Sequence, residues 1–311
     1  MAKYVLRRVL MAIFTVFVVA TLTFFLMKAV PGNPFISEKS PPQTVLDALN
    51  AKYGLDKPIS VQYIKYMSNL LKLDLGTSII MQKNYPVINI IQKMFPVSAK
   101  IGAVSLLWAV IVGVTLGCFA AYYRGTPTDS TLRVVSTIGI SMPSFVVASL
   151  LLFVFAGGIW GVFPTIFDGS PKSYVLPCFS LGFYPMCYIA RQSRASMLDA
   201  IGQEYIKTAR AKGLKTGPII FKHALRNAMI PVLTYLGPQV AFTLCGGFVV
   251  EKVFTIPGLG RYFVQSVSNR DYPVIMGTTI FLAAFIIFMN LLVDLLYKAV
   301  DPRITLGKES A

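Results

Sequence analysis

The chain contains 311 residues, of which 55% are hydrophobic and only 14% are charged, and its mean hydropathy is +0.65. A soluble globular domain carries about 25% charged residues, so too few charges remain here to cover a water-exposed surface. The composition therefore disfavours a soluble enzyme, a disordered chain and a nucleic-acid-binding domain, and it predicts an all-α membrane protein. The net charge of +16 fits this class, because the cytoplasmic loops of membrane proteins collect Lys and Arg.

Six apolar segments approach the length that a helix needs to cross a bilayer, about 20 residues. They cover residues 9–30, 98–122, 134–156, 174–190, 228–250 and 274–297. The fourth is the shortest and contains Pro177 and Pro185, which a membrane helix tolerates when its neighbours satisfy the freed carbonyl groups. We therefore expect the fourth segment to be a kinked span inside a bundle of six transmembrane helices.

The basic residues predict the orientation of these spans. Lys3, Arg7 and Arg8 precede the first span, and the segment 191–227 carries eight Lys and Arg residues. Because positive charge favours the cytoplasmic side, we expect the N-terminus in the cytoplasm, and six crossings return the C-terminus to the same side. The first span is expected to stay as an anchor, because its apolar run is too long for a cleaved signal peptide.

Three regions follow from this arrangement. Residues 1–30 hold the N-terminus and the first span, residues 31–97 form an extracellular loop, and residues 98–311 form a five-helix core. The core includes the cytoplasmic loop 191–227. Within the extracellular loop, the helical spacing of apolar residues predicts short helices at 44–53 and 60–73.

The sequence offers no constellation of residues for catalysis. Its only histidine, His223, lies in the cytoplasmic loop, and Asp294 lies four residues before Lys298, a spacing that favours an ordinary ion pair. The four cysteines lie in apolar stretches without C-x-x-C spacing, and no P-loop motif is present. We therefore expect no catalytic residue, no metal site and no cofactor bound by this chain. The pattern leaves the substrate-binding residues unassigned.

The cytoplasmic loop contains the most informative segment, residues 204–231, which read EYIKTARAKGLKTGPIIFKHALRNAMIP. A helix is expected at 206–212, Gly213 ends it, and a second helix at 219–229 leads into the fifth span. Two interpretations are open. The segment is either an amphipathic element held at the membrane surface by anionic lipid or a docking helix for a cytoplasmic partner.

This segment resembles the EAA loop of the membrane subunits of ABC importers, in which a short coupling helix contacts the ATPase subunit. With the glycine of that pattern placed on Gly213, Ala209 and Leu225 fit the pattern, whereas Lys207 and Arg226 depart from it. The run TARAKGL followed by HALRNA is similar to the dipeptide, oligopeptide and nickel branch of the family, most of all to the B subunits of oligopeptide permeases. Further motifs of this branch recur in the same order at residues 4–8, 29–35, 95–100, 142–146, 254–260, 269–272 and 301–303.

The resemblance implies an ABC importer permease fold and a subunit that forms half of a translocation pore for oligopeptides. It implies a homologous C-type permease subunit in a heterodimer, two cytoplasmic ABC ATPases that use ATP and Mg, an extracellular peptide-binding protein and membrane lipid as partners. It also implies a location in the bacterial cytoplasmic membrane. The coupling segment that docks on the ATPase would comprise Ala209, Arg210, Ala211, Lys212, Gly213 and Leu214.

Other functions compete with this one. Within the same family, the solute would be a dipeptide, nickel or glutathione. From another class, a stand-alone channel or a secondary carrier would transport without any ATPase. An intramembrane enzyme is disfavoured by the missing His and carboxylate constellation.

Overall fold

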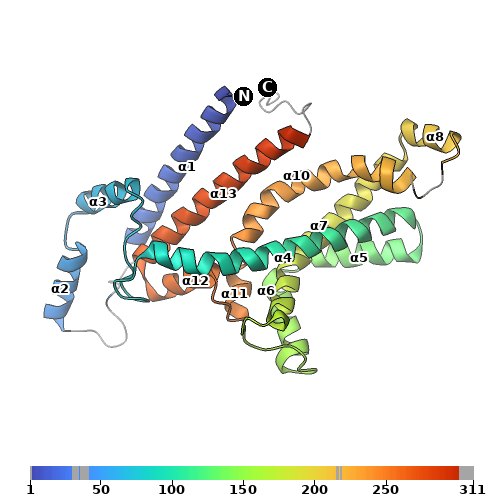
Figure 1. Ribbon diagram of the computed structural model, residues 1–311. Helices are drawn as coiled ribbons and strands as arrows, with labels where there is room; N and C mark the ends of the chain where they lie inside the picture. The colour runs from blue at the N-terminus through green and yellow to red at the C-terminus, as the bar shows by residue number, and fades with distance from the viewer. Residues whose placement is uncertain (1, 30–34, 36–41, 215–216, 218, 301–311) are drawn as a thin grey trace. The chain divides into compact units, whose positions relative to one another are not determined.

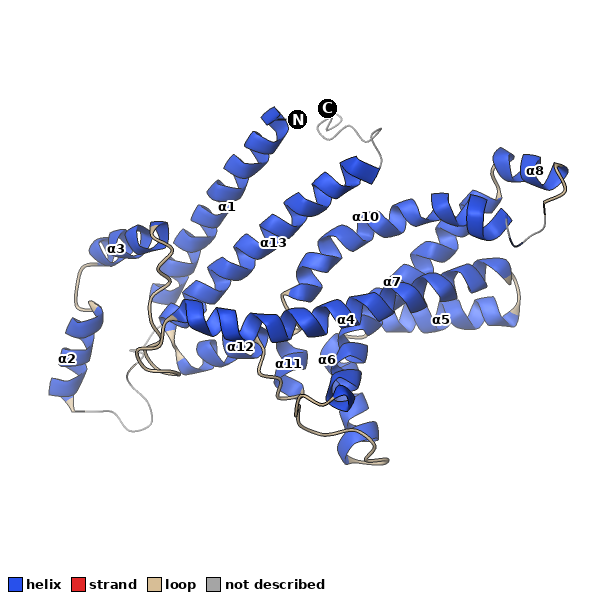
Figure 2. Cartoon of the chain, in the orientation of Figure 1, coloured by secondary structure: helices blue, strands red, loops and turns tan. Residues whose placement is uncertain are grey.

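The computed structural model describes residues 2–29, 35, 42–214, 217 and 219–300. Over these residues the chain consists of helices and connecting loops, and its only β-type pairing is an isolated bridge between Thr77 and Pro86 (Figures 1 and 2). The chain forms two compact units. Among the described residues, the first combines those up to Val97 with Pro257–Phe288, and the second combines those from Ser98 to Ile256 with Met289–Val300.

The described residues of the first unit form four complete helices and the N-terminal parts of two long ones. The complete helices are α1 (Ala2–Ala29), α2 (Gln43–Tyr53), α3 (Ile59–Leu71) and α12 (Leu259–Asn269). The long helices are α4 (Val87–Tyr122) and α13 (Tyr272–Val300). The short helices expected at 44–53 and 60–73 are present as α2 and α3. Aromatic rings join α3 to α1, because Phe24 packs against Tyr63 and Tyr66 with centroid distances of 5.3 and 5.5 Å.

A buried aspartate fixes the loop that precedes α4. The carboxylate of Asp271 accepts a hydrogen bond from the Ser78 hydroxyl at 2.5 Å. It also accepts hydrogen bonds from three successive backbone N–H groups, at 3.2, 3.1 and 2.9 Å, which belong to Ile79, Ile80 and Met81. A loop without regular pairing needs such acceptors when it is buried. This contact gives the 269–272 motif a structural role.

The second unit is built around α7 (Pro171–Ile201), which packs against α5 (Pro127–Ser141), α6 (Ser144–Leu151) and α10 (Leu225–Leu244) (Figure 1). Its described residues also form the π-helical turns η1 (Leu152–Gly157) and η2 (Ile219–Ala224) and the short helices α8 (Glu204–Ala211) and α11 (Phe248–Val253). A glycine lets α4 approach α7 closely. A Cβ at Gly117 would lie 2.5 Å from the Ala190 carbonyl oxygen, so only hydrogen fits there.

The helices differ in two ways from the spans expected from sequence. Within the described residues, four stretches are long and apolar enough to cross a membrane, namely Leu6–Ala29, Val87–Tyr122, Leu225–Val253 and Tyr272–Val293. The segment at 134–156 is a bent pair instead of one straight span, because α5 and the α6–η1 stretch meet at 104°. Pro143 explains the break. Proline has no N–H and drives the preceding residue out of the helical region, and Met142 is extended at φ −85° and ψ 124°.

The fourth expected span is a continuous 31-residue helix, α7, that runs through Pro177 and Pro185. It is not among the helices that are apolar enough to cross a membrane by length and composition. With the bent pair as one span, the described residues contain up to five candidates. The count of six spans and the N-in/C-in orientation thus stay predictions. The side chains of His223, Asp294 and Lys298, and the segments 31–34, 36–41 and 301–311, lie outside the described residues.

Candidate functional site: a coupling segment and a polar cleft

The expected coupling segment is a short helix that ends in a tight turn. Helix α8 runs from Glu204 to Ala211, and Gly213 follows with φ +76°. The Gly213 N–H donates to the Arg210 carbonyl at 2.9 Å, and the Leu214 N–H donates to the Ala209 carbonyl at 3.3 Å. A residue in the left-handed region closes a helix in this way, and glycine adopts that region without steric cost. The break that the sequence placed at Gly213 is present.

Burial divides the six expected coupling residues into two groups. Ala209 is buried, together with Ile206, in an apolar cluster that includes Met197 and Ala200 of α7 and Ala228 of α10. The other five are exposed: Arg210, Ala211, Lys212, Gly213 and Leu214. Ala209 therefore fixes α8 to its own subunit, and the turn that follows presents its side chains outward.

The charged side chains at the start of α8 form a surface ion pair. Lys207 Nζ lies 2.7 Å from Glu204 Oε1, and the two side chains are 66% and 85% exposed. Exposed pairs of this kind contribute between 0 and about 1 kcal/mol to stability. Glu204 and Lys207 thus make the outer face of α8 polar, but their ion pair contributes little to holding the helix in place.

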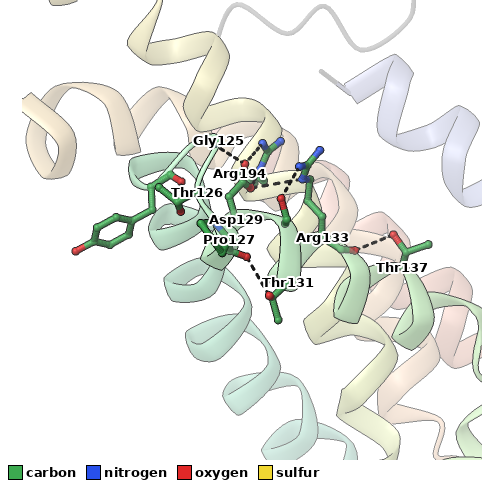
Figure 3. Close-up of polar contacts among 10 residues, drawn as sticks. Gly125, Thr126, Pro127, Asp129, Thr131, Arg133, Thr137 and Arg194 are labelled. Carbon is green, nitrogen blue, oxygen red and sulfur yellow. Dashed lines mark hydrogen bonds and ion pairs between the residues drawn. The ribbon is translucent and has the colours of Figure 1, made fainter.

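A buried ion pair lies further back along α7. Asp129, at the start of α5, is 1% exposed, and its carboxylate accepts hydrogen bonds from Arg194 Nε at 2.6 Å and Arg194 Nη2 at 2.8 Å (Figure 3). The Gly125 N–H adds a third bond at 3.1 Å, and Arg133 Nε lies 3.7 Å away. Bidentate pairs of Arg and carboxylate are among the strongest polar contacts in proteins. The pair joins α5 to α7 about two helical turns before α7 ends.

Sequence reasoning singled out neither member of this pair. The two residues are 65 positions apart in the chain, and nothing in the sequence indicates that they meet. An acid two residues after Pro127, in the first turn of a helix, is the one local signal, because carboxylates favour helix N-termini. That signal predicts a cap for α5 but gives no partner on α7.

The second unit also contains an open cleft of about 380 Å³ at the break between α5 and α6. Its walls include Ser141, Met142 and Pro143 at the break, Tyr184 of α7 and Gln239 of α10. The residues that line it are polar or apolar and none carries a charge. Over the described residues no group of His, Cys, Asp or Glu is arranged to hold a metal ion. The cleft thus offers hydrogen bonds and apolar contact.

Comparison with known families covers almost the whole chain. Residues 113–306 match the model of the binding-protein-dependent transport system inner membrane component, and residues 1–102 match the model of the N-terminal part of the same membrane component. The chain belongs to this family of transport-system membrane components. The permease family consists of transporter subunits and not of enzymes, and the resemblance to ABC importer permeases is confirmed.

Individual relatives of the permease come from peptide transport systems. The dipeptide transport system permease protein DppB of Bacillus subtilis is 45% identical over 309 residues, which are 99% of this chain and 100% of the relative. The oligopeptide transport system permease protein OppB of Salmonella typhimurium is 42% identical over 311 residues, 98% of this chain and 99% of the relative. DppB of Lactococcus lactis is 39% identical over 98% of this chain and the full relative. Both kinds of system are represented at similar identity.

Proposed function

We propose that the chain forms half of the translocation pore of a peptide importer of the bacterial cytoplasmic membrane. A homologous C-type permease subunit supplies the other half, an extracellular binding protein delivers the peptide, and two cytoplasmic ATPases use ATP and Mg to drive the cycle. The observation that carries this proposal is the similarity to dipeptide and oligopeptide permeases over 98–99% of the chain. Oligopeptides are the proposed cargo.

The exposed turn after α8 is the proposed contact with an ATPase. Arg210, Lys212 and Leu214 offer two cations and an apolar side chain on a surface that Gly213 shapes. Ala209 is packed against α7 and α10 from below, so a force on the turn reaches both helices. ATP binding in a partner subunit then biases two arrangements of the helices, which is how a ligand bound elsewhere drives a conformational change.

The proposed topology has six crossings with both termini in the cytoplasm. Helices α1, α4, α7 and α13 each cross once, the bent α5–α6 pair crosses as one broken span, and α10 with α11 forms another. The broken pair is compatible with a crossing, because non-helical backbone is tolerated at membrane depth where protein or a cavity surrounds it. Reporter fusions after Lys72 and after Leu214 test this: the first is expected to report outside and the second inside.

The coupling assignment is tested with Gly213→Leu in the complete complex, reconstituted in vesicles with its binding protein and ATPases. Leu strains the φ of +76° by about 1–2 kcal/mol and adds bulk to the docking turn. Gly169→Leu is the matched control, because Gly169 has φ +82° and equally open surroundings in another loop. We expect at least about tenfold slower ATP-driven peptide uptake for Gly213→Leu, because bulk in the docking turn weakens the contact with the ATPase and a loss of about 1.4 kcal/mol there is a factor of ten. The control should stay within about twofold. Equal uptake by the two variants would remove the coupling role from this turn.

Dipeptide import is the second candidate, favoured by the 45% identity to a dipeptide permease. The cargo classes are distinguished by measuring the uptake of a labelled pentapeptide in the presence of an unlabelled competitor. The competitors are a pentapeptide, a dipeptide, glutathione and nickel. Competition by pentapeptides alone supports oligopeptide import, whereas strong competition by dipeptides reassigns the system. Uptake of nickel or glutathione in place of any peptide would contradict peptide import altogether.

A further inference from the structure

The first unit contains a cavity of about 270 Å³ between several of its elements. Helix α3 lines it with one face, because the helical spacing brings five residues to the same side: Val61, Gln62, Lys65, Tyr66 and Asn69. The other walls come from the ends of α1 and α2, the turn after α2, the loop before α4 and the start of α13 (Figure 1). The cavity therefore lies where the long apolar helices α1 and α13 meet the polar part of the unit.

Four lysines line this cavity, which we name the lysine cavity. They come from α1, α2, the turn after α2 and α3, and they are Lys28, Lys52, Lys57 and Lys65. Asp74 is the single carboxylate among the described lining residues, and it accepts a hydrogen bond from the Gly76 N–H at 2.9 Å. Within the described part of the chain, no carboxylate lies within ion-pair distance of any of the four lysines. The excess of positive charge favours an anion in the cavity.

Several contacts hold the segments that carry these lysines. Lys52 Nζ donates to Asn84 Oδ1 at 3.3 Å. The Lys57 carbonyl accepts a hydrogen bond from Gln62 Nε2 at 2.7 Å, which ties the turn after α2 to α3. The loop before α4, which forms another wall, is the one that Asp271 fixes. The positive charges are thus brought together by the fold of the unit.

The wall of the lysine cavity also contains a hydroxyl group without a partner. Tyr66 stacks on Phe24 with ring centroids 5.5 Å apart, and its buried hydroxyl has no hydrogen-bond partner among the described residues. A buried polar group without a partner is costly, so such groups commonly bond to water, an ion or a ligand. A ligand has to displace a neighbouring side chain to reach this oxygen, and the lysine side chains around the cavity are long and flexible. An anionic oxygen would accept the Tyr66 hydrogen bond.

The lysine cavity lies at a membrane boundary. Lys28 is one residue before the end of Leu6–Ala29, the stretch of α1 that can cross a membrane. A lysine at the end of a membrane helix reaches the headgroup region while its stem covers apolar surface. Phe25 and Leu26 of α1 are exposed beside it, and so is Ile64 on a face of α3 that does not line the cavity. These side chains offer apolar contact for acyl chains next to the lysines.

We propose that the lysine cavity binds the phosphate group of an anionic phospholipid such as phosphatidylglycerol, in the leaflet where α1 ends. Lys28, Lys57 and Lys65 supply compact positive charges, and the Tyr66 hydroxyl supplies a donor. Lysine binds phosphate as a point charge, whereas arginine suits planar carboxylates, and the described lining residues include no arginine. The proposal goes beyond peptide import, because it requires only that α1 crosses the membrane. In the proposed topology the leaflet is the outer one.

The test uses two double variants of the complete complex. The cavity variant combines Lys28→Gln with Lys65→Gln, and the control combines Lys72→Gln with Lys83→Gln, two exposed lysines of the same unit that do not line the cavity. Each complex is titrated in detergent with phosphatidylglycerol or phosphatidylcholine, and the bound lipid is counted by native mass spectrometry. The unaltered complex and the control should bind phosphatidylglycerol more tightly than phosphatidylcholine. The cavity variant should bind phosphatidylglycerol about tenfold or more weakly, because lysines at a membrane surface attract anionic headgroups.

A second variant covers the case in which the cavity variant fails to assemble. Tyr66→Phe removes the hydroxyl without the partner and changes no charge. It should weaken phosphatidylglycerol binding by about threefold or more, because the hydroxyl no longer donates to a charged oxygen. Phosphatidylglycerol binding equal to that of the unaltered complex in both Tyr66→Phe and the cavity variant would overturn the proposal.

Two further outcomes would assign the lysine cavity to another ligand. Inorganic phosphate that binds without anionic lipid, to the control but not to the cavity variant, would make a free anion the ligand and overturn the lipid assignment. Unchanged phosphatidylglycerol binding with weaker docking of the extracellular binding protein would make the cavity a protein contact and overturn it as well.

Discussion

Arg194→Met is expected to destabilise the protein, because it removes one partner of a buried ion pair. Arg194 supplies two short hydrogen bonds to the Asp129 carboxylate, which is 1% exposed. Met keeps the length and apolar contact of the side chain but leaves the carboxylate without its bidentate partner. Removing one member of a buried pair costs about 3–5 kcal/mol.

The local geometry places the cost at the lower end of that range. The Gly125 N–H remains at 3.1 Å, and Arg133 remains at 3.7 Å with a side chain that is 53% exposed. Arg194 itself is 19% exposed, so water replaces part of the lost interaction. We therefore expect a loss of about 3 kcal/mol in the free energy of unfolding. For a chain of this size that lowers the unfolding midpoint by on the order of 5 °C.

The assay is thermal unfolding of the purified protein in detergent, with two comparison variants. Arg133→Met removes the longer, exposed contact and should cost about 0.5 kcal/mol or less. The double variant Asp129→Leu with Arg194→Met removes both charges, leaves none uncompensated, and should recover most of the loss. The buried-pair explanation is wrong if Arg194→Met and Arg133→Met have the same unfolding midpoint, or if the double variant is the least stable of all.

Three further predictions follow from contacts in the two units. Gly117→Val should lower the melting midpoint or block assembly of the second unit, because its Cβ would lie 2.5 Å from the Ala190 carbonyl oxygen. A midpoint equal to that of the unaltered protein would contradict the close packing of α4 on α7. Asp271→Ala leaves one buried and two partly buried N–H groups without their acceptor and should cost about 3 kcal/mol. Protease cleavage near residues 78–82 should then accelerate, whereas Asp271→Asn, which keeps one acceptor oxygen, should be milder. Lys207→Ala should change neither stability nor uptake measurably, because its ion pair with Glu204 is exposed. A clear loss of uptake would show that Lys207 itself contacts a partner.

Local patterns in the sequence anticipated several elements closely. Apolar runs located the helices α1 and α13, and the spacing of apolar residues located α2 and α3. Gly213 marked the end of α8 because only a left-handed residue closes that turn comfortably. The family motifs could also be identified from the sequence, because residue types and their order define them without any tertiary contact.

Other features depend on partners that the sequence does not name. Pro143 breaks a run that hydropathy alone reads as one span, and the 104° bend opens the cleft. The motif gives Ala209 a position in the docking segment, and only the fold shows that this face of α8 is buried against the cluster of α7 and α10.

The sequence by itself determined that the chain is a helical membrane protein, where most of its helices lie and to which family it belongs. These properties depend on composition, on period and on local backbone preference, which act over a few residues. Only the tertiary structure decided that Asp129 pairs with Arg194 and that Asp271 caps a loop nearly 200 residues away. It also decided that the ring of Tyr188 in α7 stacks on the ring of Tyr235 in α10. Each of these contacts joins residues far apart in the chain, and their energy depends on burial that arises only when the helices pack.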